Sequence, residues 1–313
     1  MMSWLDPTRS ILLDPNDPDL GDRTYHIPCY ASLDTLVRSI ERIGIINRPL
    51  VQEMPGGKMV LVLGRRRIEA ARKVGLNAVQ VRIVPREMPE ADGFLLAFWD
   101  NIGQRFFDVA TQAVVVRRLL EIFQRSTVAT EFLPVLGIAA KGPRLESLRA
   151  IGGLEDPVLA SLASGRILEK TAEILARLDR KERMICMSLM NQLGMNANKN
   201  AELVVNLFDL SVFHHKPISK IISVSDAVAL LENELWSAPE KASRFRELVR
   251  SWKFPELVKD EKNFRDWQRR MSLPKQITIR HAQSFENHSC TIEIRSDSRD
   301  EANKILARLL NEA

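Results

Sequence analysis

The spacing of hydrophobic residues changes twice along this chain, and the two changes limit the folds that it can adopt. Between residues 25 and about 85, short strand-like runs alternate with runs at helical spacing. From Phe94 to about Glu234 almost every hydrophobic run has helical spacing, and strand-like alternation returns at residues 276–294. The sequence therefore predicts an α+β chain with a small N-terminal α+β domain, an all-helical middle domain and a small C-terminal β-β-α piece.

These changes of pattern divide the 313 residues into five segments. Asp and Pro punctuate the first segment, so we expect an extended lead-in rather than a folded element. The last segment is close to the lower size limit for independent folding, which predicts that it dimerises. The segments are a lead-in at 1–24, an N-terminal domain at 25–105, a helical domain at 106–235, a basic helical linker at 236–275 and the β-β-α piece at 276–313.

Within the N-terminal domain, glycine and proline mark the ends of the expected elements. The expected order is a helix over 33–43, strands over 49–53 and 58–63, a helix over 65–74 and a strand over 78–84. Gly44 and Gly75 end the two helices, and the two glycines at 56–57 predict a hairpin between the first two strands.

Composition restricts the class of protein. Lys and Arg number 45 and Asp and Glu number 40, which gives a formal net charge of +5 and suggests a polyanionic partner. The three cysteines, Cys29, Cys186 and Cys290, are too far apart in sequence for a metal motif or a disulfide framework. The cysteines therefore predict a protein with reduced thiols. No apolar run has the length of a membrane span, so we expect a cytoplasmic protein without membrane contact.

The most informative stretch is the turn from a predicted strand through Gly64 into a helix that begins with Arg65, Arg66 and Arg67. A helix N-terminus carries unpaired N–H groups and partial positive charge, so three cations are unfavourable there unless an anion is bound. A phosphate would satisfy both the N–H groups and the guanidinium groups. The alternative is that the arginines face solvent or pair with acids such as Glu69 and Glu41, and the local sequence leaves both interpretations open.

The order of elements and three segments resemble the ParB family, the partition proteins of bacterial chromosomes and plasmids. The family has Gly-x-x-x-Pro, Gly-Glu-Arg-Arg-x-Arg-Ala and Glu-Asn-x-x-Arg segments in its N-terminal domain. Here the corresponding segments are GIINRPLV at 44–51, GRRRIEA at 64–70 and DNIGQR at 100–105. Residues 147–154 and 162–167 resemble the helical middle domain of the family, and the C-terminal strand-strand-helix piece is similar to its dimerisation domain.

The resemblance implies a ParB/sulfiredoxin-type N-terminal domain in a clamp-like, DNA-binding homodimer that binds CTP with Mg²⁺. It implies that Gly44 and Pro49 shape the loop on the cytidine side. Phosphates would be held at the glycine-rich turn, by Gly64, Arg66 and Arg67, with Arg65 beside them. It also implies that Asn101 and Arg105 complete the triphosphate and Mg²⁺ site.

Three departures from the family pattern concern this site. Arg65 stands where the family has Glu, and Glu69 stands where it has Arg, so the charges are exchanged four residues apart on one helix face. The third segment is one residue longer, and one residue turns a helix by about 100°. We therefore expect either Asn101 or Arg105 to miss its position. Asp100 stands where the family has a Glu longer by one methylene, and the positioning of a water molecule tolerates little misplacement, so the sequence predicts at most weak CTPase activity, with Asp100 as its catalytic group.

For DNA contact, the resemblance implies a helix-turn-helix segment between Val128 and Ile151. Its second helix would begin near Lys141, and the expected DNA-binding residues are Lys141, Arg144 and Arg149. Pro134 falls inside the expected first helix. The alternative is an ordinary helical bundle whose arginines face solvent.

Two further functions stay open at this stage. One is an enzyme of the same superfamily, a phosphotransferase or nuclease, for which Asp100, Glu69 and Glu41 are the candidate carboxylates. The other is a degenerate interaction scaffold. The sequence has no P-loop motif, and no cysteine lies in the glycine-rich turn where sulfiredoxin relatives need one. The acidic lead-in is a candidate docking segment for a ParA-like ATPase in a nucleoid-associated complex.

Overall fold

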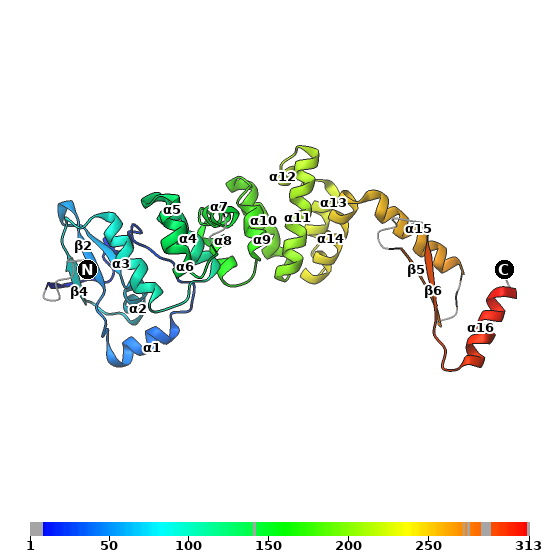
Figure 1. The fold of residues 1–313 in the computed structure, drawn as a ribbon, viewed down its shortest axis with the longest axis horizontal. Helices are drawn as coiled ribbons and strands as arrows, with labels where there is room; N and C mark the ends of the chain where they lie inside the picture. Colours follow the sequence, from blue (N-terminus) through cyan, green and yellow to red (C-terminus); the bar gives the residue numbers. More distant parts are fainter. Residues whose placement is uncertain (1–8, 140–141, 272, 274–275, 283–288, 312–313) are drawn as a thin grey trace. The chain divides into compact units, whose positions relative to one another are not determined.

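The computed structural model describes residues 9–139, 142–271, 273, 276–282 and 289–311. Internal contacts divide the chain into two compact units, one of Met1–Met187 with Asn196–Ala201 and one of Ser188–Met195 with Glu202–Ala313. Figure 1 shows the elements in chain order. The helical region expected as one domain at 106–235 is therefore shared between the two units.

The N-terminal domain is built on a four-stranded sheet in the order β1-β4-β2-β3. Its strands are β1 (Ser10–Leu13), β2 (Leu50–Glu53), β3 (Met59–Leu63) and β4 (Val79–Val84). The strands β2 and β3 form an antiparallel hairpin around the short helix η2 (Pro55–Gly57), while β2 and β4 run parallel. The last three strands agree with those expected from the sequence.

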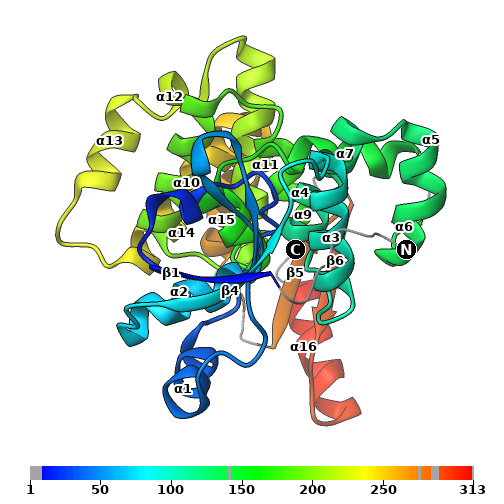
Figure 2. The same cartoon turned by 90° about the vertical axis from the view of Figure 1, so that its left-hand side faces the viewer.

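One face of the sheet is covered by α2 (Arg65–Val74), which follows β3 directly. Ile68 and Ala71 of α2 are buried against Val51 and Leu61 of the sheet, because residues three apart lie on the same face of a helix. The helix α1 (Asp34–Ile43) contacts α2, and the two lie next to each other in Figure 2.

The lead-in differs from the extended, unfolded segment that the sequence suggested. Ser10–Leu13 pairs in antiparallel register with Arg82–Val79 and so adds a strand to the sheet. The short helix η1 (Pro18–Gly21) then places Leu20, which is 1% exposed, in the hydrophobic core. The burial of Leu20 in the core and the pairing of Ser10–Leu13 with the free edge of β4 stabilise this folded arrangement. These contributions outweigh the local preference of Asp and Pro for irregular structure.

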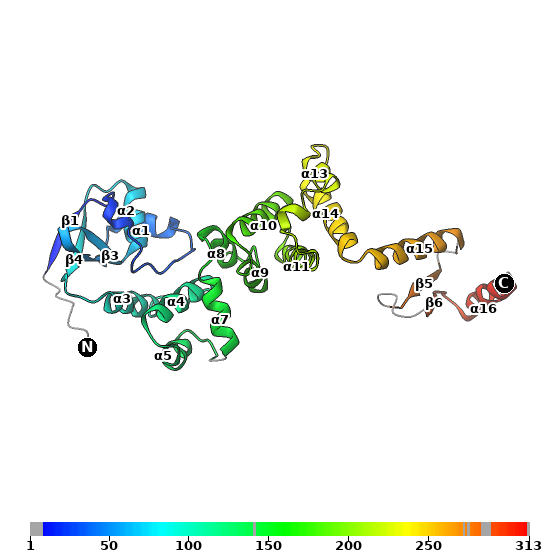
Figure 3. The same ribbon diagram turned by 90° about the horizontal axis from the view of Figure 1, so that it is seen from above.

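The rest of the first unit is helical, as expected. In Figure 3, α3 and α4 follow one another along the chain, and α7 packs against α4. Pro134 lies in the first turn of α6, where its missing N–H costs nothing. The helices are α3 (Glu90–Ile102), α4 (Val109–Ile122), α5 (Arg125–Thr127), η3 (Val128–Phe132), α6 (Leu133–Val135), α7 (Gly142–Ile151), α8 (Asp156–Ala163), α9 (Glu169–Leu175) and α10 (Arg180–Leu193), whose residues from Ser188 on belong to the second unit.

The second unit consists mainly of helices and ends with an antiparallel pair of strands and a helix, as expected. Ile292 is 59% exposed and Leu306 is 45% exposed, so apolar side chains of the terminal piece remain uncovered in one chain. No helix in the described parts of the chain has the length and apolar composition to cross a membrane. The elements are α11 (Ala197–His214), α12 (Ile218–Ile221), α13 (Ser225–Glu232), α14 (Ala238–Lys253), α15 (Pro255–Met271), β5 (Ile277–His281), β6 (Cys290–Ile294) and α16 (Arg299–Asn311).

Candidate functional site

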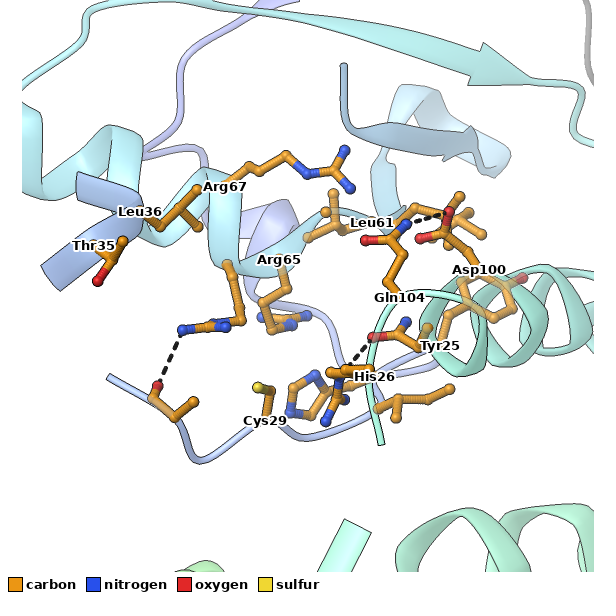
Figure 4. A pocket seen from close by; sticks show the side chains of 18 of the residues that line it. Tyr25, His26, Cys29, Thr35, Leu36, Leu61, Arg65, Arg67, Asp100 and Gln104 are labelled. Carbon is orange, nitrogen blue, oxygen red and sulfur yellow. Dashed lines mark hydrogen bonds between the residues drawn. The ribbon is translucent and has the colours of Figure 1, made fainter. Parts of the chain in front are cut away.

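A cavity of about 570 Å³ opens at the N-terminus of α2 in the N-terminal domain. Figure 4 shows its side chains, with Arg65 and Arg67 on one side and His26 and Cys29 on the other. The walls come from three parts of the first unit, which are the segment 25–39, the β3–α2 turn and the end of α3. The polar and charged lining residues comprise Tyr25, His26, Cys29, Ser32, Thr35, Ser39, Arg65, Arg66, Arg67, Asp100, Asn101, Gln104 and Arg105.

The start of α2 has the properties of an anion site. Gly64 precedes the helix at φ 93°, a left-handed conformation that glycine adopts without steric cost, and provides no side-chain cap. Its carbonyl accepts from the N–H groups of Arg67 and Ile68 at 2.9 and 3.1 Å. The first turn contains no acidic residue, so no side chain of its own neutralises the positive end of the helix.

Two arginines of this turn donate to backbone carbonyls of the segment that precedes α1. Arg65 donates to the carbonyl of Asp22, and Arg66 donates to the carbonyls of Ala31, at 3.1 Å, and of Ser32. The Nε of Arg66 is buried without a hydrogen-bond partner among the described residues. A buried N–H donor without an acceptor is unfavourable, so this atom adds to the cost of holding the Arg66 guanidinium group in place.

The other two arginines of the cavity make contacts of the same kind. Arg67 donates to the carbonyl of Asn47 at 2.7 Å, and Arg105 donates to the carbonyl of Pro28 at 2.7 Å. Among the described residues, no carboxylate forms an ion pair with any of the four arginines. The cavity therefore gathers four guanidinium groups that are not neutralised by a paired acid.

The electrostatics of these arginines reflect their burial. Burial lowers the pKa of Arg65, Arg67 and Arg105, because the charged form of each group loses water. The charge of Arg66 lowers the pKa of Arg105 further. Guanidinium groups stay protonated in proteins, so their burial side by side creates an unfavourable positive potential in the cavity. A bound anion would relieve this potential.

The exchanged charges at positions 65 and 69 do not form the pair that their spacing suggested. The charge of Glu69 favours the protonated form of Arg65, but in the described structure no ion pair joins the two side chains. Arg65 instead reaches the carbonyl of Asp22 in the lead-in. The folded lead-in supplies this acceptor, so it changes where the side chain points.

Asn101 and Arg105 both line the cavity, which corrects the expectation that one of them would miss it. Asn101 lies in the last turn of α3, but the helix ends at Ile102 and Gly103 begins a turn. The N–H of Arg105 nevertheless donates to the carbonyl of Asn101 at 3.0 Å, so the helical spacing of four residues continues to Arg105. Side chains four residues apart lie on one face of a helical turn, and the Nε of Arg105 donates to Oδ1 of Asn101 at 3.2 Å.

Asp100 lies where two cavities meet. Its Oδ1 accepts from Gln104 Nε2 at 2.9 Å, and its charge favours the protonated form of Arg67. On the far side is a second cavity of about 480 Å³, whose walls include Arg48 and Arg82. The described residues contain no group of three or more His, Cys, Asp and Glu side chains placed to hold a metal ion. A metal ion here would thus need ligands from a bound molecule.

Gly44 and Pro49 have structural positions beside the cavity rather than in its lining. Gly44 follows α1 at φ 71° and ψ −167°, a backbone conformation that essentially only glycine adopts. Pro49 packs against Gly64, so the loop that contains Pro49 supports the turn from which the arginines project.

Two residues of the opposite wall escaped prediction, because nothing in their local sequence marks them. His26 and Cys29 precede α1 and meet the arginines only through the fold. The sequence places no cysteine in the glycine-rich turn, but the fold brings Cys29 into the wall of the same cavity, which Arg105 also lines.

The residues predicted to contact DNA differ in their surroundings. Lys141 lies outside the described residues. Arg144 at the start of α7 forms an ion pair with Glu169. Arg149 projects from the exposed face of α7, with a side chain that is 64% exposed and 3.7 Å from Glu146. Of the two arginines that the structure describes, Arg149 is the more available to a partner.

Comparison with known proteins agrees with the expected family for the N-terminal region. Residues 26–101 match the family model of the ParB N-terminal domain. No curated protein matches the chain.

Several solved structures are similar to parts of the chain. One is the C-terminally truncated chromosome-partitioning protein ParB from Caulobacter crescentus complexed with CTP-gamma-S, with 24% identity over 54% of this chain and 93% of that chain and a TM-score of 0.24. The same protein complexed to the centromeric parS site has 20% identity over 56% and 90%, with a TM-score of 0.29. A Pnob8-like ParB-N domain has 12% identity over 78% and 97%, with a TM-score of 0.34.

The matched region contains β2, β3, β4, α1 and α2 and almost all of α3, and so all but a few of the polar and charged residues that line the cavity. Its boundaries lie close to those expected for the N-terminal domain. Residues 26–101 of this chain form a ParB N-terminal domain.

Proposed function

We propose that this chain is a ParB-like partition protein that binds DNA and whose N-terminal domain binds CTP with Mg²⁺. The observation that supports nucleotide binding best is the group of four arginines around one cavity, namely Arg65, Arg66, Arg67 and Arg105. Each side chain donates to at least one backbone carbonyl, and none is paired with an acid among the described residues. A polyphosphate would supply stronger, charged acceptors to all four.

The chemistry of the donor set suits a triphosphate. The cavity offers guanidinium groups and the N-terminus of α2, both of which interact favourably with phosphate oxygens. Mg²⁺, when bound, would neutralise part of the phosphate charge, and it usually takes few protein ligands. Asp100 and the Oδ1 of Asn101 are the oxygen donors at the edge of the cavity that would face it.

The DNA-binding part of the proposal rests on α7, where Arg149 is exposed. A site on one chain becomes a clamp only when two chains associate. The terminal piece, with the uncovered side chains of Ile292 and Leu306, is the surface that we assign to dimerisation. Double-stranded DNA and a second copy of the chain are thus the proposed partners.

The nucleotide proposal is tested by titrating CTP in the presence of Mg²⁺ into the wild-type chain and into two alanine variants. Arg66→Ala removes a cavity arginine, whereas Lys73→Ala removes an exposed cation from the same helix outside the cavity. We expect Arg66→Ala to weaken binding at least tenfold and Lys73→Ala to leave it within about twofold. Equal affinities of the three proteins, or no binding by the wild type, would contradict the proposal.

Weak CTP hydrolysis is the second candidate function, and the position of Asp100 next to Arg67 favours it. A carboxylate beside a phosphate site can orient a water molecule. Turnover that is lost in Asp100→Ala while CTP affinity persists would establish hydrolysis. Binding without turnover would leave a nucleotide-gated DNA-binding protein.

A further inference from the structure

One histidine lines the arginine cavity but lies outside the three motif segments. His26 is half-buried, and its ring has no hydrogen-bond partner among the described residues. Figure 4 shows the ring beside Cys29, on the side of the cavity that faces Arg65. Because its ring nitrogens are not hydrogen-bonded to other described residues, the imidazole in the wall of this arginine-lined cavity can contact a bound ligand.

His26 also lines another cavity, of about 490 Å³, whose charged residues are Asp22, Arg23, Glu90, Arg117, Arg118 and Glu121. The charged groups with the largest influence on the ring come from four parts of the first unit. Arg65 lies on α2, Arg23 in the lead-in and Arg105 after α3, and all three charges oppose protonation of the ring. Asp156 at the start of α8 favours protonation, but it also forms an ion pair with Arg23 at 2.6 Å. Burial is the largest influence, and together these effects lower the pKa of His26 to about 4. The ring is therefore neutral at physiological pH in the free protein.

We propose that His26 contacts the bound polyphosphate as an imidazolium and takes up a proton when the ligand binds. This inference rests on the proposed function of the cavity, and it adds a ligand-contacting residue that the three motif segments do not contain. It makes nucleotide affinity depend on pH through one identified side chain.

The reason lies in the hydrogen-bonding capacity of the two partners. An ionised phosphate oxygen only accepts hydrogen bonds, whereas a neutral imidazole presents one donor and one acceptor. Protonation turns both ring nitrogens into donors, so the charged ring matches a phosphate better than the neutral ring does. The ligand also brings negative charge among Arg65, Arg23 and Arg105, which reverses the potential that disfavours the proton.

The sign of the pH effect follows from linkage. The pKa of His26 is about 4 in the free protein and higher in the complex, so binding takes up protons between these two values. Affinity therefore rises as pH falls through the pKa of the complex. The rise approaches tenfold per pH unit where the free ring is neutral and the bound ring is protonated.

The first experiment measures proton uptake by calorimetric titration of CTP and Mg²⁺ in two buffers with different ionisation enthalpies, from pH 6 to pH 8. The variant is His26→Gln, which keeps a polar side chain that does not titrate. Protons exchanged by CTP itself are the same for both proteins, so the difference between them isolates the ring. We expect wild type to take up more protons than the variant, by as much as one per ligand at the lower pH.

The second experiment follows the ring directly by NMR of histidine-labelled chain. The resonance that disappears in His26→Gln belongs to His26, one of 5 histidines in the sequence. We expect it to titrate near pH 4 in the free protein and at least two pH units higher with CTP bound. This spectroscopic readout separates a contact with the ligand from a merely structural role.

The outcomes distinguish this inference from the function on which it rests. If wild type binds CTP but takes up no more protons than His26→Gln, and the resonance of His26 does not move, the inference is wrong and the nucleotide site stands. If wild type does not bind CTP at all, both are wrong. An extra proton together with a raised His26 midpoint supports the inference.

Discussion

Gly64 lies so close to Pro49 that a Cβ atom at position 64 would be 3.0 Å from both Cα and Cβ of the proline. The contact joins two of the segments that carry the family resemblance. It holds the start of α2 against the loop before β2, and so fixes the direction in which the arginines leave the helix. Gly64 also has a φ of 93°, so its backbone conformation and its surroundings both require glycine.

Gly64→Ala is therefore expected to destabilise the domain by about 1–3 kcal/mol in chemical unfolding. Gly75→Ala is the matched control, because Gly75 has a similar φ of 79° but no atom within 4 Å of the place that a Cβ would take. In Gly75→Ala, the free energy of unfolding should fall only by the cost of placing alanine at a positive φ. Equal losses for the two variants would show that the contact with Pro49 does not constrain the turn.

A second glycine tests the packing of α7 against α4. A Cβ at Gly152 would lie 2.7 Å from the carbonyl carbon of Ala113, which is backbone and cannot rotate away. Gly152→Ala should therefore lower the free energy of unfolding by about 1–3 kcal/mol or more, as overpacking does in other proteins. Its neighbour Gly153 has only contacts of 3.4 Å or longer, so Gly153→Ala should be nearly neutral. Thermal unfolding of both variants measures the difference, and similar melting temperatures would contradict the packing.

Asp22 gives a stability effect that depends on pH. Burial works to raise the pKa of its carboxyl group, but hydrogen bonds from Thr24 and Lys58 outweigh it and lower the pKa to about 2. A depressed pKa stabilises the folded state above the ordinary value of 3.8, and this contribution is lost as pH falls from there toward 2.

Asp22→Asn should thus lower the melting temperature at pH 7, and the deficit relative to wild type should shrink below about pH 4. Melting curves between pH 3 and pH 7 follow this difference. A deficit of constant size across that range would mean that the carboxylate charge contributes nothing.

The elements of the N-terminal domain could be predicted because local signals define them. Gly44 and Gly75 end their helices, and the glycines after Pro55 close a hairpin, so short-range sequence determined those boundaries. The lead-in was mispredicted because Leu20 gains its energy from a core built by residues far along the chain. Such a contact leaves no periodic pattern in the segment itself.

In the candidate site, too, some residues are marked by local sequence and others are brought in only by the fold. The arginines at 65–67 and Asn101 stand in recognisable motifs, and the cavity brings them together. The expectation that either Asn101 or Arg105 would miss the cavity did not consider that these two side chains are four residues apart, a spacing that keeps them on one face of a helical turn. His26 could not be predicted, because only the fold places it opposite Arg65.

For DNA binding, the two described arginines of α7 should differ. Arg149 is exposed, so Arg149→Ala should weaken binding to duplex DNA and reduce the slope of log affinity against log salt by about 1. Arg144 is paired with Glu169, so Arg144→Ala should change the slope less. Fluorescence anisotropy across a salt series measures both, with Lys73→Ala as the control. An unchanged slope in Arg149→Ala would remove this residue from the DNA interface.

The central claim is that the arginine cavity holds a chain of phosphates, and the dependence of affinity on phosphate number tests it most directly. Calorimetric titration of wild-type protein with CTP, CDP and CMP in the presence of Mg²⁺ gives the three affinities. Because hydrogen bonds to charged groups contribute about 1.5–3 kcal/mol, we predict a loss of at least tenfold for each phosphate removed. Equal affinities for CTP and CMP would contradict the claim, since the arginines would then contribute nothing to binding.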